Sequence, residues 1–182
     1  AKSPAILAMD PGRQQAAVAS AVQAIKSKVF FVQQIGAFFG MFGYAALSEK
    51  IGRKAALGLV LGLAFAAVQG AFWGVRDEVS AYLLAFPLGM FSLAPFSAYA
   101  VYFPELYPTR LRATGVGFCY NCARILAAFA PFALGALAYR FADPVDQSLG
   151  FRQAATLVAF VYFVGFAGLL FSPETRGKPL PE

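Results

Sequence analysis

Residues 55–73 read AALGLVLGLAFAAVQGAFW, a stretch of nineteen residues without a charged side chain. As an α-helix with a rise of about 1.5 Å per residue, this stretch would be about 28 Å long, which matches a hydrocarbon core about 30 Å thick. Charged residues stand on both sides of it, with Arg53 and Lys54 before and Arg76 after. The stretch therefore predicts a helix that spans a membrane.

Four further apolar blocks have the same character and cover about residues 29–47, 79–103, 113–139 and 154–171. The chain is 59% apolar and 13% charged, whereas soluble domains are about 45–50% apolar and about 25% charged. In lipid, each backbone amide and carbonyl must be paired within its own segment, which favours helices, and the alternating segments of a membrane barrel are absent from the sequence. We therefore predict an all-α fold, a polytopic transmembrane helix bundle of about five spans over residues 29–171.

The two ends of the chain differ from this bundle. Residues 1–28 are predicted to be a loop with a helix near the membrane interface at Gln14–Lys26, and residues 172–182 form a polar tail. The start, Ala1-Lys-Ser-Pro, has neither an initiator Met nor the pattern of a signal peptide. We interpret that start as the boundary of a fragment.

Charge and composition exclude several classes of function. The net charge is +6, but the basic residues stand in small groups between the apolar blocks, as membrane-surface anchors do, so no nucleic acid partner is predicted. The chain has no histidine, and the C-x-x-C sequence at Cys119 and Cys122 lies inside an apolar block, where packing is a better explanation than redox chemistry or zinc. No metal, no cofactor and no enzymatic activity are predicted.

Three polar loops carry a resemblance to a known family. Residues 45–54, AALSEKIGRK, resemble the G-x-L-a-D-R-x-G-R-R loop of the major facilitator superfamily, and differ from it at Ala45 and Glu49. The motif residues are Glu49, Lys50, Gly52, Arg53 and Lys54. We expect the carboxylate of Glu49 to accept hydrogen bonds at a neighbouring helix end and Gly52 to allow a tight turn. The two basic residues that follow Gly52 would contact the cytoplasmic headgroups. A generic basic loop at the cytoplasmic surface is the alternative.

The second and third loops follow the third and fifth spans. Residues 105–115 look like the E-x-[FY]-P-T-x-x-R-x-x-G loop of sugar and metabolite:proton symporters of that superfamily, and residues 173–177 are similar to the P-E-T-K-G of its sugar porters. The matching positions are Glu105, Pro108, Thr109, Arg112 and Gly115 in the second loop, and Pro173, Glu174, Thr175, Arg176 and Gly177 in the third.

This resemblance implies that the chain corresponds to helices 8–12 of a twelve-helix carrier, with the three loops in the cytoplasm. The seventh helix and the N-terminal half of the carrier would then be missing partners. Such carriers rock two bundles of six helices around a site near the middle of the membrane.

Arg124 is the one ionisable side chain well inside a predicted span, about twelve residues beyond Arg112. A charge that faces lipid there costs from about 3 to more than 10 kcal/mol, so Arg124 should face a cavity or a partner. It could attract an anion such as a carboxylate-bearing metabolite, or it could be a structural gate residue. Tyr120 and Asn121 could add donors to the same helix face, although Asn121 could equally form a hydrogen bond between helices.

The third span contains three polar side chains near Pro95, namely Ser92, Ser97 and Tyr99. The resemblance places this span as the tenth helix, which lines the central cavity of such carriers. The three side chains could bind a polar solute, or the serine hydroxyls could bond back to their own helix.

Together these features predict part of a secondary active transporter that moves a small organic metabolite, a sugar or an organic acid. Its partners would be the lipid bilayer and the solute, and it would be a multi-pass protein of a bacterial inner or plasma membrane. A channel or an accessory membrane subunit without a transport cycle is the alternative. The spans contain no acidic residue, so proton coupling finds no support in this chain.

Overall fold

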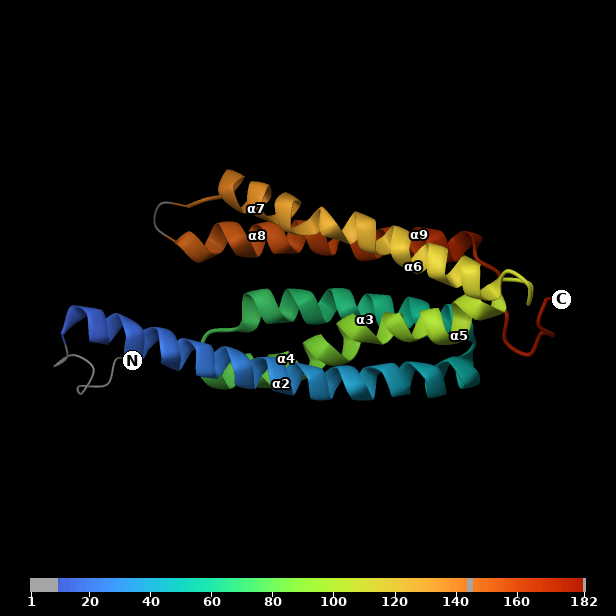
Figure 1. Ribbon diagram of the computed structural model, residues 1–182, viewed down its shortest axis with the longest axis horizontal. Helices are drawn as coiled ribbons and strands as arrows, with labels where there is room; N and C mark the ends of the chain where they lie inside the picture. Colours follow the sequence, from blue (N-terminus) through green and yellow to red (C-terminus); the bar gives the residue numbers. More distant parts are fainter. Residues whose placement is uncertain (1–9, 144–145, 182) are drawn as a thin grey trace.

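The computed structural model describes residues 10–143 and 146–181, and this part of the chain contains helices but no strand (Figure 1). The elements are α2 (Pro11–Ile51), α3 (Arg53–Gly74), α4 (Glu78–Leu93), the 3-10 turn η1 (Ala94–Phe96), α5 (Ser97–Glu105), α6 (Arg112–Ala128), α7 (Ala130–Arg140), α8 (Gln147–Ala159) and α9 (Val161–Phe171).

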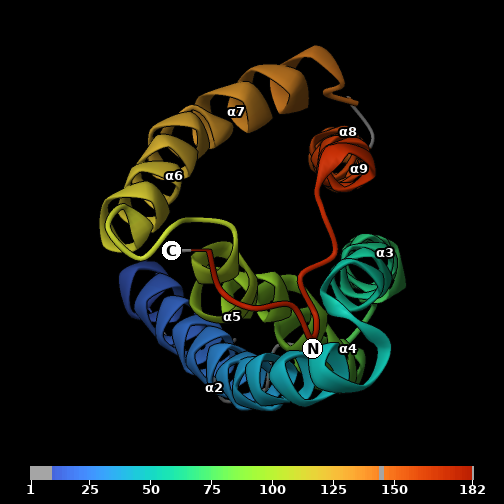
Figure 2. The ribbon, with the colours of Figure 1, turned by 90° about the vertical axis from the view of Figure 1, so that its right-hand side faces the viewer.

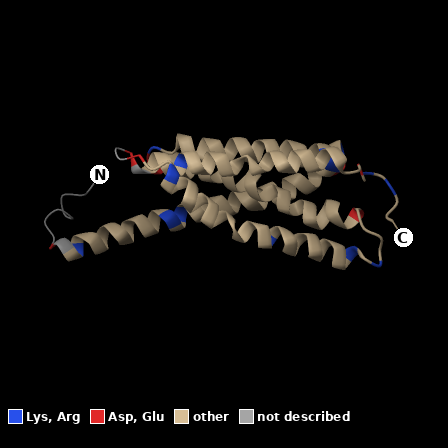
Figure 3. Cartoon of the chain, turned by 90° about the horizontal axis from the view of Figure 1, so that it is seen from above, with Lys and Arg blue, Asp and Glu red and all other residues tan. Residues whose placement is uncertain are grey.

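Five helical stretches in the described residues are long and apolar enough to cross a membrane, which confirms the predicted all-α bundle of five spans. They cover Gly12–Ile51, Arg53–Gly74, Glu78–Glu105, Arg112–Arg140 and Ser148–Phe171. The charged side chains gather near the ends of the bundle and leave long uncharged stretches between them (Figure 3).

The first helix is longer than the sequence prediction. Residues 14–26 and the first span form one continuous helix, α2, of 41 residues. At about 1.5 Å per residue it is about 60 Å long, and its N-terminal part extends beyond the other helices (Figure 1). No glycine or proline stands between Arg13 and Ile35, so nothing interrupts the helix at the predicted boundary near residue 28.

Three of the five spans are interrupted. The third changes to a 3-10 turn at Ala94–Phe96, which contains Pro95, while Pro87 stays inside α4. The fourth is interrupted at Phe129, just before Pro131, and the fifth at Phe160. The fifth span also begins earlier than predicted, because the side chain of Asp146 accepts a hydrogen bond from the Ser148 amide at the start of α8.

Helices α2 and α4 touch through their backbones. A Cβ atom added at Gly36, Gly40 or Gly89 would lie between 1.8 and 2.1 Å from a backbone carbonyl oxygen of the facing helix. Small residues allow such close approach of membrane helices, where packing rather than the hydrophobic effect holds helices together. These glycines therefore fix the distance between the first and the third span.

The neighbouring core combines three alanines with larger side chains, including two tyrosines. Its buried residues come from α2, α3, η1 and α5, and they are Tyr44, Ala56, Leu57, Val60, Leu61, Ala94, Ala98 and Tyr102. By contrast, every residue of α6 and α7 is described and none is buried. Figure 2 shows these two helices on the side of the bundle opposite α3 and α4, and α7 packs beside α8.

The α2–α4 contact predicts a large difference between two glycine substitutions on one helix. Gly40→Ala should destabilise the protein by about 1–3 kcal/mol or more, because its methyl group would collide with Met90. Gly43→Ala is the matched control, since its added Cβ would meet no atom of another helix within 4 Å among the described residues. Thermal unfolding of the detergent-solubilised protein measures both, and equal midpoints would contradict the packing described here.

Candidate functional site

The three motif loops meet at one end of the bundle around an ion pair. The guanidinium of Arg53 donates to the carboxylate of Glu105 through Nε and Nη2, at 3.1 Å to Oε2 and 2.8 Å to Oε1. The two side chains are only 13% and 19% exposed. Arg53 also donates through Nη1 to the buried hydroxyl of Ser48, at 2.9 Å. A bidentate pair with this little exposure holds the first loop against the second.

Glu174 connects the third loop to the start of α3. Its carboxylate accepts hydrogen bonds from the backbone amides of Arg53 (2.8 Å) and Lys54 (3.1 Å), which are free donors at a helix N-terminus. Gly52, with φ 99°, makes the turn between α2 and α3, and a Cβ atom there would lie 2.8 Å from the Glu174 carboxylate. The turn therefore needs glycine for its backbone conformation and for space.

The hydrogen bonds to Glu174 also affect its titration. Partial burial raises the pKa of Glu174. Hydrogen bonds from the backbone amides of Arg176, Arg53, Lys54 and Thr175 together lower it by more, so the resulting pKa is below the usual value. The ionised form is therefore the one that the fold stabilises.

The C-terminal segment ties these loops together as it crosses the end of the bundle (Figure 2). The hydroxyl of Thr175 donates to Glu105, and the hydroxyl of Tyr102 donates to the carbonyl of Pro173. Further along, the amide of Thr109 donates to the carbonyl of Pro181 at 3.2 Å. The second and third loops thus share hydrogen bonds at several points.

Several other motif residues shape the backbone of the second and third loops. Arg112 donates through Nε to the carbonyl of Pro104 at 2.9 Å, and a Cβ at Gly115 would lie 2.6 Å from the ring of Tyr107. The carbonyl of Pro108 accepts a hydrogen bond from the backbone amide of Leu111. Gly177 has a positive φ of 71°. Lys50 is exposed in the last turn of α2.

Two expectations for the first loop are wrong. The carboxylate that accepts from a helix end belongs to Glu174 and not to Glu49, which is exposed. The side chain of Arg53 is paired with Glu105 and does not extend toward headgroups. The reason is that Glu174 of the third loop reaches the start of α3, a contact that the pattern of the first loop does not reveal.

A second feature is a central pocket of about 480 Å³ among the interrupted spans. It is lined by Ser92, Pro95, Phe96, Tyr99, Tyr120, Ala123, Arg124, Ala127, Val161 and Tyr162. The interruptions surround it, since Pro95 and Phe96 belong to η1, Ala127 is next to the last residue of α6, and Val161 begins α9. Irregular backbone at membrane depth is tolerated where it borders a cavity.

Four of the six predicted path residues line this pocket, namely Arg124, Tyr120, Tyr99 and Ser92. The guanidinium carbon of Arg124 lies 5.6 Å from the centre of the Tyr120 ring, a cation–π contact. Within residues 10–143 and 146–181, no carboxylate lies within ion-pair distance of Arg124. The hydroxyl oxygen of Ser92 is buried and has no hydrogen-bond partner in the same part of the chain. The pocket therefore offers one cation between aromatic rings, and the Ser92 hydroxyl lies buried behind its lining.

The other two predicted residues bond elsewhere. Asn121 donates through Nδ2 to the carbonyl of Gly117 in its own helix, at 2.8 Å. Ser97 donates to the carbonyl of Met41 in α2, at 2.8 Å. The Ser97 bond joins α5 to α2, whereas the Asn121 bond stays within α6. Neither side chain lines the central pocket.

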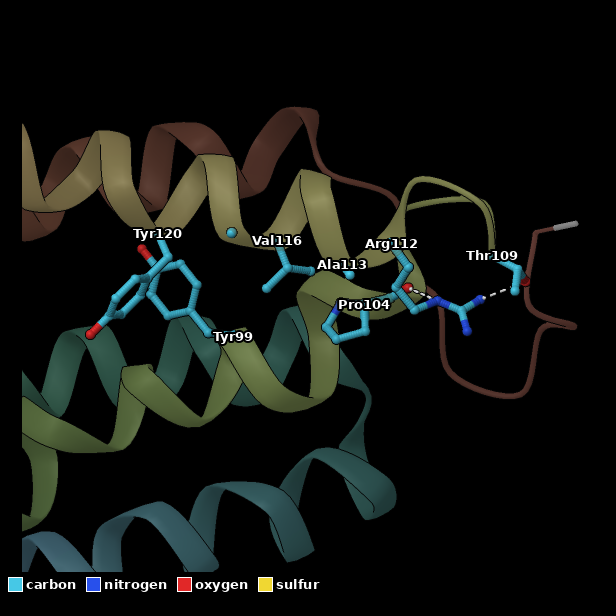
Figure 4. A pocket seen from close by; sticks show the side chains of 8 residues that line it. Tyr99, Pro104, Thr109, Arg112, Ala113, Val116 and Tyr120 are labelled. Atoms are coloured by element: carbon cyan, nitrogen blue, oxygen red, sulfur yellow. Dashed lines mark hydrogen bonds between the residues drawn. The ribbon is translucent and has the colours of Figure 1, made fainter.

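A further pocket of about 650 Å³ lies between the central pocket and the motif end (Figure 4). Its lining includes Tyr99, Tyr120 and Arg112, with Thr109 and Pro104 close to the loop. Tyr99 and Tyr120 therefore belong to both pockets.

Sequence reasoning missed several residues of these two regions. Phe96 and Tyr162 line the central pocket, and Ser48 and Tyr102 bond in the motif cluster. Tyr162 could have been found from the sequence, because its side chain carries a hydroxyl group in the middle of the apolar block 154–171. The thiols of Cys119 and Cys122 are free, and Cys119 lies 3.1 Å from the hydroxyl of Tyr107.

Comparison with known proteins assigns the chain to a family. The family model for sugar (and other) transporters matches residues 18–182. The chain belongs to this transporter family. The family is part of the major facilitator superfamily, which confirms the resemblance carried by the loops. The chain is accordingly a multi-pass membrane protein, and its bacterial relatives indicate a plasma membrane.

Relatives in this family include transporters with different named solutes. A "probable 4-methylmuconolactone transporter" of Cupriavidus pinatubonensis is 28% identical over 81% of this chain and 33% of its own length. The cis,cis-muconate transport protein of Acinetobacter baylyi is 31% identical over 73% of this chain and 30% of its own. The inner membrane metabolite transport protein YdjE of Escherichia coli is 35% identical over 58% of this chain and 24% of its own. The chain thus spans about a third or less of the length of these relatives.

The Arg53–Glu105 pair predicts strong coupling in a double-mutant cycle. Arg53→Ala and Glu105→Ala should each cost about 1.5–3 kcal/mol of unfolding free energy, because each leaves a charge with little exposure and without its ion-pair partner. The double variant should lose less than the sum, with a coupling of about 0.5–3 kcal/mol. Arg76→Ala, at an exposed position in the loop after α3, is the control. Additive effects of the two single changes would refute the pairing.

The Glu174 contacts predict a specific dependence on pH. Because the folded-state pKa lies below the ordinary value of 4.5, ionised Glu174 stabilises the fold above that pH, and this contribution is lost as the pH falls through the folded-state pKa. Glu174→Gln should be less stable at pH 7 and should lose less stability on acidification. Unfolding midpoints between pH 7 and pH 3 measure this, with Glu49→Gln as the exposed control. An acid-induced loss equal to that of the unmodified protein would argue against this role.

Proposed function

We propose that this chain forms the C-terminal part of a secondary carrier that moves a small organic acid by alternating access. The observation that carries the proposal is Arg124, a guanidinium at the central pocket without a carboxylate partner among the described residues. A charge at this depth in a membrane is costly unless something compensates it. An anionic solute would supply that compensation, and the planar fork of arginine suits a carboxylate.

The lining of the pocket favours an acid over a sugar. A sugar presents hydroxyl groups around its whole ring, and each one that loses water needs a partner in the site. Apart from Arg124, the polar side chains of the pocket are Ser92 and the hydroxyls of three tyrosines, while the other lining residues are apolar. A relative named for cis,cis-muconate, a carboxylate, supports the same choice.

The arrangement of the spans supports a transport cycle rather than catalysis. The pocket lies among interrupted helices, as in carriers whose binding sites are formed by discontinuous spans. The motif cluster would lie on the cytoplasmic side, where it braces the loops of this bundle against one another. A second bundle, corresponding to the remaining length of the relatives, would complete the path. With this partner the protein acts as a transporter and not as an enzyme.

Arg124 provides the test. In the full-length protein reconstituted in liposomes, uptake of labelled organic acids should exceed uptake of labelled sugars. Arg124→Gln should lower kcat/KM for the transported acid by about 10- to 100-fold, since a charge-assisted hydrogen bond is lost. Arg140→Gln, at an exposed position outside the pocket on the same span, should have little effect.

Two results would count against this function. One is an Arg124→Gln protein that transports the acid with unchanged kcat/KM. The other is a protein that transports sugars but none of the acids. The amount of folded protein in the liposomes is measured for each variant, so that poor folding is not mistaken for poor transport.

A further inference from the structure

The two tyrosines shared by the pockets occupy a special position on the proposed path. Tyr99, from α5, and Tyr120, from α6, line both the central pocket with Arg124 and the pocket with Arg112 (Figure 4). Each pocket thus offers one arginine, and the tyrosine pair stands at the boundary between them. An anion that moved from one pocket to the other would pass against these two rings.

The rings are held in a defined geometry. Their centres are 5.4 Å apart and their planes meet at 88°, an edge-to-face contact. Tyr99 is also stacked on Phe103, with centres 4.6 Å apart and planes 10° apart. Tyr120 in turn lies under the guanidinium of Arg124. Tyr99 is thus fixed by its own helix, and Tyr120 by its contacts with Tyr99 and Arg124.

This geometry presents flat aromatic surface beside a cation. Aromatic pairs prefer offset-stacked or edge-to-face arrangements, which a flat unsaturated molecule can adopt and a puckered saturated ring cannot. A carboxylate in the plane of such a molecule would reach Arg124 while its face lies against a tyrosine ring.

We propose that Tyr99 and Tyr120 determine specificity, and that they select flat, unsaturated carboxylates over saturated carboxylates of the same size. This inference rests on the proposed function, because it assumes that an acid enters the pocket at Arg124. It specifies the kind of acid that is selected, and it assigns this selection to two residues that lie outside the motif loops.

A matched pair of solutes tests the inference. Benzoate and cyclohexanecarboxylate have the same carboxylate and the same ring size, but only benzoate is flat. In the full-length protein in liposomes, benzoate should compete for uptake about 3- to 10-fold better, the range expected for one or two aromatic contacts. Because the readout is a ratio, it does not depend on how much protein each preparation contains.

Substitutions at the two tyrosines assign the preference to them. Tyr120→Leu and Tyr99→Leu should each bring the ratio close to one, whereas Tyr120→Phe and Tyr99→Phe keep the ring and should keep the ratio. A ratio of one in the unmodified protein would overturn the inference, as would a ratio that both leucine variants preserve. If neither acid competes and only neutral solutes are carried, the proposed function itself fails, so the two failures can be told apart.

Discussion

The structure depends on one constraint, which is that a polar group surrounded by hydrocarbon must have a partner. The helices meet this constraint by pairing their backbone groups internally, and the charged side chains meet it by gathering near the ends of the bundle. Arg124 is the exception, and it lies where three spans are interrupted and a pocket opens. The same constraint therefore explains both the uncharged stretches and the position of the proposed site.

The motif end shows how short sequence patterns become one structure. Two carboxylates, Glu105 and Glu174, connect three loops that are separated by about 50 to 70 residues along the chain. Arg53 contacts both carboxylates. Its backbone amide donates to Glu174, and its side chain pairs with Glu105. Each of the three patterns therefore supplies a hydrogen-bond partner to another.

Much of the fold could be predicted from the sequence, because length and hydropathy alone determine a span. The position of Arg124 inside a span follows from the same pattern. The continuation of α2 to Pro11 was missed because its first part is alanine-rich but not apolar enough to resemble a span. The interruption at Phe160 was missed because no proline or glycine stands next to it.

The details of the site were harder to predict, because they depend on contacts between distant residues. Which carboxylate caps α3 is decided by the path of the C-terminal segment, more than 100 residues away in sequence. Ser92 and Ser97 are five residues apart, which on a helix places their side chains about 140° apart around the axis. Ser97 donates to a carbonyl of α2, whereas the Ser92 hydroxyl is buried and has no partner in the described part of the chain.

The backbone contact between α2 and α4 has a mechanical consequence. Two helices whose carbonyls and glycines touch cannot slide or rotate past each other without collision, so this pair moves as one stiff body. The rest of the bundle is joined to this pair by side-chain contacts, such as that of Tyr120 in α6 with Tyr99 in α5, and α7 packs beside α8. The α2–α4 pair is therefore a rigid unit of this bundle, and it keeps the first and third spans in register.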